Sequence, residues 1–86
     1  MIDVADNGSG HFMVTVTEGG SRTSHDVTLD DTYYQKLTGG SITKVELIRR
    51  SFEFLLERES KESILRSFDL PVIGRYFPEY ERTIAS

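Results

Sequence analysis

Residues 42–56, with the sequence ITKVELIRRSFEFLL, decide the fold because they predict an amphipathic helix with a clearly marked start. Thr43 and Glu46 have the T-x-x-E spacing of a capping box, in which each side chain accepts a backbone N–H at the helix N-terminus. Ile42 and Leu47 have the spacing of a hydrophobic staple. We therefore expect the helix to begin directly after Thr43.

The apolar surface of this helix is wider than a single neighbour can cover. At about 100° per residue, an apolar stripe and a second apolar patch lie side by side. The stripe contains Val45, Ile48, Phe52, Leu55 and Leu56, and the second patch contains Leu47, Ser51 and Phe54. Charged side chains cover only roughly a third of the circumference. The helix therefore needs two partners, which are either two elements of its own chain or one element and a second subunit.

The chain is small, acidic and free of cysteine. It has 86 residues and a formal net charge of −4. A domain of this size is marginally stable, and oligomerisation is one common source of additional stability. The lack of cysteine excludes disulfides and thiolate metal sites, and no segment reaches the roughly 18 apolar residues of a membrane span. We expect a soluble cytoplasmic protein with no membrane partner, and the negative charge makes a nucleic-acid partner unfavourable.

Two alternating segments around Gly19-Gly20 predict a β-hairpin over residues 11–29. With the glycines at the centre of the turn, Val14 lies opposite His25. This register puts one apolar set on the same face, namely Phe12, Val14, Val16, Val27 and Leu29. A slip of one residue would turn one strand's apolar side chains toward polar ones, so we expect the first register.

Short helices are expected on both sides of the central helix. Asp30 and Gly39 have the residue types of an N-cap and a C-cap for a helix between them, and Ser60 can cap a short helix that runs through Phe68. The sequence therefore predicts an α+β fold, in which an N-terminal β-hairpin packs against a central amphipathic helix, with short flanking and C-terminal helices.

We expect residues 11–86 to form a single small α+β domain. Residues 1–10 end in the turn-rich sequence NGSG and are expected to be a flexible lead, although Ile2 and Val4 leave a short strand open.

No motif predicts catalysis, a cofactor or a metal site. Ser24-His25-Asp26 contains the residue types of a hydrolase triad, but neighbours on a strand point to opposite faces and do not converge. His11 and His25 fall on opposite faces of the predicted hairpin and cannot share an ion. We therefore expect a protein that is not an enzyme, with no catalytic, cofactor-binding or metal-binding residues.

Residues 61–80 offer an alternative function, because two short amphipathic helices there would suggest a DNA-binding helix-turn-helix. The match is poor. Leu65 stands where the motif prefers a small residue, Asp69 stands in place of the turn glycine, and Pro78 falls inside the recognition helix. A DNA-binding transcriptional regulator is therefore the second hypothesis.

The first hypothesis is a non-catalytic protein-interaction or regulatory module, antitoxin-like or adaptor-like, that forms a homodimer and binds a protein partner. It rests on the wide apolar surface of the central helix and on residues 76–80, YFPEY, whose aromatic side chains form either a lid over the core or a docking patch. The expected interface residues are Leu47, Phe54, Tyr76 and Tyr80.

Four strings of the sequence are similar to a known group of proteins. They are YYQKLTGG, SFEFLLERE, KESILRSFDL and YFPEYE. Together they resemble short, uncharacterised prokaryotic proteins, and the likeness covers about residues 12 to 84. The resemblance implies a prokaryotic cytosolic origin and assigns no activity or binding residues.

Overall fold

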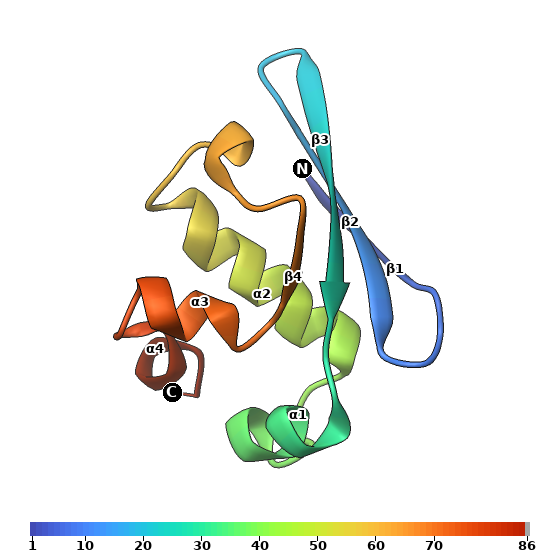
Figure 1. Ribbon diagram of the computed structural model, residues 1–86, viewed down its shortest axis with the longest axis vertical. Helices are drawn as coiled ribbons and strands as arrows, with labels where there is room; N and C mark the ends of the chain where they lie inside the picture. The colour runs from blue at the N-terminus through green and yellow to red at the C-terminus, as the bar shows by residue number, and fades with distance from the viewer. Residues whose placement is uncertain (86) are drawn as a thin grey trace.

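A computed structural model describes residues 1–85 as one four-stranded sheet with four α-helices and a short 3-10 helix. The elements are β1 (Ile2–Asp6), β2 (His11–Glu18), β3 (Ser21–Thr28), α1 (Asp31–Thr38), α2 (Lys44–Leu56), η1 (Lys61–Ser63), β4 (Ser67–Asp69), α3 (Val72–Tyr76) and α4 (Tyr80–Ala85). The strand order is β1-β2-β3-β4. Figure 1 shows the sheet along one side of the molecule and the helices on the other. The expected α+β class is confirmed.

The hairpin has the predicted register, with Val14 opposite His25 and Phe12 opposite Val27. The predicted apolar set is buried on one face, whereas Ser24 and Asp26 are exposed on the other. The alternation of a half-buried strand therefore predicted both the pairing and the inward face.

Residues 2–6 form a strand where a flexible lead was expected. β1 pairs antiparallel with β2, from Ile2 opposite Val16 to Asp6 opposite Phe12. Ile2 and Val4 pack partly buried against the core, while Asp3 and Ala5 between them are exposed. Their alternation, too short to predict a strand by itself, is stabilised by the edge that β2 provides.

Both helices next to the hairpin begin where the sequence predicts. Thr43 Oγ1 accepts the N–H of Glu46 at 3.1 Å, and Asp30 Oδ1 accepts the N–H of Tyr33 at 2.8 Å. The Glu46 carboxylate does not complete the capping box, because it binds the Arg50 side chain at 3.0 Å. Only the half of the capping box that depends on the threonine is present.

The helix expected from Ser60 to Phe68 is wrong. The segment forms one turn of 3-10 helix, η1, and then the strand β4, which pairs parallel with β3. Ser60 makes no side-chain cap hydrogen bond. The exposed edge of β3 provides backbone partners for β4, and this tertiary contact overrides the local helical pattern.

Both apolar surfaces of α2 are covered within the chain. On the sheet side, the Phe52 ring lies 5.4 Å from the ring of His25 and 6.0 Å from that of Phe68. On the other side, the Phe54 ring lies 5.2 Å from the ring of Tyr80, whose hydroxyl is 2.6 Å from Ser51 Oγ. The sheet and the C-terminal helices are thus the two partners that α2 requires.

Candidate functional site

The four expected interface residues have different environments. Leu47, Phe54 and Tyr80 are buried in the core of the single chain, at 0%, 4% and 0% exposure. Tyr76 is 67% exposed. Phe54 packs against Phe77 and Tyr80, so in the single chain Leu47 and Phe54 present almost no surface for a twofold interface, and self-association stays a prediction. Of the four residues, only Tyr76 can contact a partner directly.

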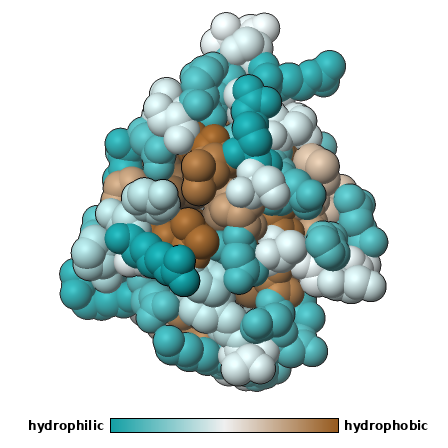
Figure 2. All heavy atoms as spheres, viewed as in Figure 1, coloured by the Kyte–Doolittle hydropathy of each residue, from teal (hydrophilic) through white to brown (hydrophobic). Residues whose placement is uncertain are grey.

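An apolar groove lies beside Tyr76, between η1 and α3. It is lined by Leu55, Glu59, Ser63, Ile64, Leu65, Phe68, Val72, Ile73, Tyr76 and Phe77. Figure 2 shows apolar side chains gathered in the middle of this face, with hydrophilic side chains around them. The groove encloses about 230 Å³, less than the roughly 300–1,000 Å³ typical of small-molecule sites. Its size suits individual side chains of a larger partner.

Two exposed apolar side chains, those of Leu65 and Tyr76, form part of the rim of the groove. In the part of the chain that the structure describes, the exposed large hydrophobic residues are Met1, Leu65 and Tyr76. Leu65 is 46% exposed and stands on the η1 side of the groove, whereas Tyr76 ends α3 on the other side. Two of the three exposed apolar residues therefore belong to one surface.

His25 attaches the η1 side of the groove to the sheet. Its Nδ1 lies 2.7 Å from the carbonyl oxygen of Leu65, so this nitrogen donates, and its Nε2 lies 2.8 Å from Thr23 Oγ1. Burial lowers the pKa of His25, although the Leu65 hydrogen bond acts in the opposite direction. A neutral ring can donate to Leu65 and accept from Thr23. His25 is therefore a structural anchor of the groove.

The groove lining carries little charge. Glu59 is the one charged side chain in the lining, and the lining contains no histidine, lysine or aspartate that could act with it as an acid–base pair. Residues 1–85 contain no group of three or more carboxylate or imidazole side chains placed to hold a metal ion. None of the helices described is long and apolar enough to cross a membrane.

The other candidate residues of the sequence remain apart. Ser24 and Asp26 are exposed while His25 between them is buried, so the three do not converge. His11 is exposed on the opposite side of the hairpin from His25. Residues 61–80 contain a 3-10 turn, a strand and a short helix in place of the two helices of a helix-turn-helix. The element on which the DNA-binding hypothesis depends is therefore not formed.

Comparisons with protein-family models, with curated proteins and with solved structures find no match to this chain.

Sequence reasoning missed two residues of the site, Leu65 and Phe68. Both were assigned to a helix, which would have turned Leu65 toward the core. The signal for the strand is Ser67-Phe68-Asp69, an apolar residue between two polar ones, but a single alternation is too short to distinguish from a helix. Only the pairing with β3 reveals it.

Proposed function

We propose that this protein is a non-catalytic interaction module that docks a segment of a partner protein in the apolar groove. One observation carries the proposal. The chain buries its large apolar residues almost everywhere, yet it leaves Leu65 and Tyr76 exposed on facing sides of one hollow. An exposed apolar patch surrounded by polar residues is typical of a protein-binding surface.

The character of the lining supports docking over a reaction. Eight of its ten residues are aliphatic or aromatic, and the other two are Glu59 and Ser63. Aromatic side chains at the edge of a groove provide contact area at a low cost in conformational entropy. Tyr76 has both an apolar ring and a hydroxyl, which suits it to a surface that is hydrated until the partner binds.

In this proposal, the hairpin β2–β3 packs on α2 and is the rigid support of the groove. The protein acts in the cytoplasm. The homodimer expected from the sequence is kept as a competing occupant. With Leu47 and Phe54 buried, the groove is a surface that a second copy could occupy in place of another protein.

Site-specific photocrosslinking in the native host tests the proposal. A photoreactive phenylalanine at position 76 replaces one exposed aromatic ring with another, and the same residue at position 22 is the control, because Arg22 is exposed on β3 and does not line the groove. We expect a discrete crosslinked partner from position 76 alone, lost when Leu65→Asp puts a charge on the rim.

Two outcomes would overturn the proposal. The first is the same pattern of crosslinks from positions 76 and 22. The second is a pair of negative results: position 76 gives no crosslink, and the Leu65→Asp variant leaves the phenotype of the host unchanged. A crosslinked product with twice the mass of the 9.8 kDa chain would instead identify a second copy as the occupant.

A further inference from the structure

We infer that the groove and the outer edge of β4 form one site, which binds an extended segment of the partner as an additional strand of the sheet. This inference rests on the proposed function and specifies the kind of partner. The juxtaposition that carries it is an open strand edge directly beside an apolar hollow, with one unpaired arginine on each side.

The outer edge of β4 offers free backbone groups. The carbonyl of Arg66 accepts the N–H of Asp26 at 2.7 Å, and the N–H of Leu70 donates to the carbonyl of Thr28 at 2.9 Å. Because alternate residues of a strand bond the same neighbour, Ser67 and Asp69 turn their N–H and C=O groups away from β3. Within residues 1–85, no other strand pairs with this edge.

The groove lies where the side chains of an added strand would point. Phe68 projects from β4 toward the helices and lines the groove, while its neighbours Ser67 and Asp69 are exposed. Side chains alternate between the two faces of a strand, so a segment paired with β4 would place every second side chain over Phe68, Leu65 and Tyr76. This arrangement is strand addition, in which the backbone provides affinity and the pockets provide specificity.

The opposite edge of the sheet lacks this combination. β1 is also an edge strand, but it carries the exposed carboxylates Asp3 and Asp6, and the hollow beside it combines the apolar Met1, Ile2 and Leu56 with four charged side chains, Glu18, Arg49, Glu53 and Glu57. Charged side chains on an edge discourage pairing with another strand. β4 is therefore the edge on which an apolar segment gains most.

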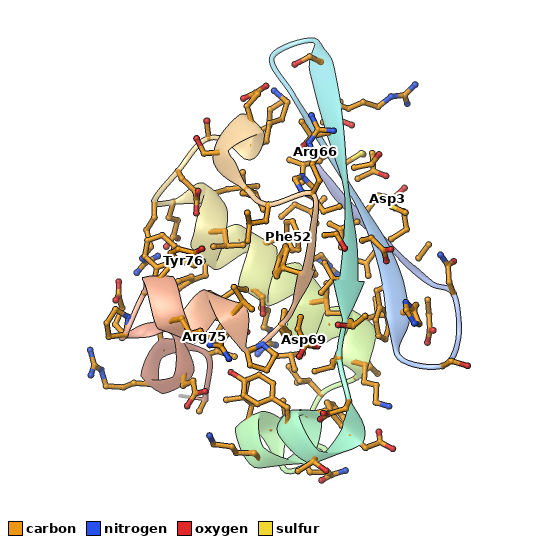
Figure 3. All side chains as sticks on the ribbon, viewed as in Figure 1. Asp3, Phe52, Arg66, Asp69, Arg75 and Tyr76 are labelled. Atoms are coloured by element: carbon orange, nitrogen blue, oxygen red, sulfur yellow. The ribbon has the colours of Figure 1, made fainter. Side chains whose placement is uncertain are left out.

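Charges of both signs surround the site, because Glu59 lines the groove and Asp69 is exposed on β4, and the two flanking arginines indicate a segment with acidic residues at its ends. Arg66 directly precedes β4 and Arg75 lies on α3, nearer the other end of β4 in Figure 3. Both are exposed, and neither forms an ion pair with any residue that the structure describes. In a chain with a net charge of −4, two unpaired arginines beside one groove favour a partner with acidic residues flanking its apolar ones.

Synthetic peptides provide the test. The probe is a set of acetylated, amidated peptides of sequence Asp-X-Thr-X-Thr-X-Asp, in which X is Val, Ile or Leu, and each control has the same composition with the three X residues consecutive. Titration followed by amide chemical shifts should give dissociation constants near or below about 100 μM for the best alternating peptides. Binding should be at least about tenfold weaker for their controls.

Backbone methylation separates strand addition from simple apolar contact. The amide nitrogens of the X residues form one alternating set and those of the Thr residues form the other. Methylating one of these sets should weaken binding by at least about tenfold, and methylating the other should have little effect. Only one of the two alternating sets faces β4. Equal sensitivity of the two sets would overturn the inference.

Matched variants test the protein side. Ser67→Pro removes an outward N–H that β3 does not use, and Ser67→Ala is its control because it keeps that N–H. We expect at least about tenfold weaker peptide binding for the proline variant and little change for alanine. Arg75→Glu should weaken binding several-fold at about 0.15 M salt, and the same change at exposed Arg22 should not.

The failure of this inference differs from that of the proposed function. If no alternating peptide binds better than its control at about 1 mM, or if Ser67→Pro binds as well as Ser67→Ala, strand addition is refuted, yet a crosslink from position 76 would still support docking in the groove. A dimer at about 100 μM that Ser67→Pro dissociates would replace the partner segment with a second copy.

Discussion

Tyr80 and Tyr76 are one helical turn apart in the sequence and lie in opposite environments. Tyr80 has no exposed surface and its hydroxyl is 2.6 Å from Ser51 Oγ, whereas Tyr76 is 67% exposed on the rim of the groove. Figure 3 shows Tyr76 beside α3, between this helix and α2. The backbone turns from helical to extended at Phe77, between them. Burial here depends on the direction of the chain, since the two side chains are chemically the same.

The two tyrosines belong to two different regions of the molecule, the core around α2 and the groove. The core around α2 has no unsatisfied buried side-chain polar atom among the residues described, and its aromatic rings contact one another. The groove exposes apolar surface and borders free backbone groups. Apolar surface that stays exposed at the groove contributes less to the stability of the fold than the same surface would if it were buried.

The largest expected difference between the regions comes from truncating apolar side chains. Phe52→Ala should lower the free energy of unfolding by about 3–5 kcal/mol, because Phe52 is fully buried and its truncation leaves a cavity in the core. Leu65→Ala should cost under about 1 kcal/mol, since nearly half of this side chain is exposed. Urea unfolding followed by circular dichroism measures both. Equal losses would show that the groove rim is part of the core.

The tyrosine hydroxyls provide a sharper comparison. Ser51 Oγ donates its single proton to the carbonyl of Leu47 at 2.8 Å, so the Tyr80 hydroxyl must donate to Ser51. Tyr80→Phe should therefore cost about 1–2 kcal/mol. Tyr76→Phe should change stability by less than about 0.5 kcal/mol. Thermal or urea unfolding of the two variants decides the matter, and a loss of the same size in Tyr76→Phe would contradict the assignment.

The smallest expected effect is on the pH dependence of the free energy of unfolding. It arises from His25, whose hydrogen bond to the carbonyl of Leu65 joins the core to the groove. Burial lowers the pKa of His25 below its ordinary value of 6.5. The unfolded chain therefore binds more protons as the pH falls through 6.5, and the free energy of unfolding decreases in that range.

Comparison of variants isolates this contribution. His25→Gln, which can keep both hydrogen bonds, should show a smaller loss of stability between about pH 7.5 and 5.5 than the unmodified protein. If the free energy of unfolding of His25→Gln depends on pH as steeply as that of the unmodified protein, the His25 contact does not depend on a neutral ring.

The site was less predictable than the fold. Tyr76 was among the expected interface residues and is exposed, but the expectation did not distinguish it from Tyr80. Leu47 and Phe54 were chosen because the apolar surface of α2 is too wide for one partner, and that width is real. The sequence could not show that the second partner is the chain's own C-terminal segment, since this depends on where α3 and α4 pack.

The sequence by itself determined the elements whose signals are local. Thr43 and Asp30 mark helix starts through hydrogen bonds to residues three positions away, and the register of β2 and β3 follows from alternation around Gly19-Gly20. Only the tertiary structure decided that Ser67–Asp69 is a strand, because the segment is held by backbone pairing with β3, about forty positions earlier in the chain, through hydrogen bonds at the flanking residues Arg66 and Leu70. The groove exists because β4 is held there, and no local pattern specifies it.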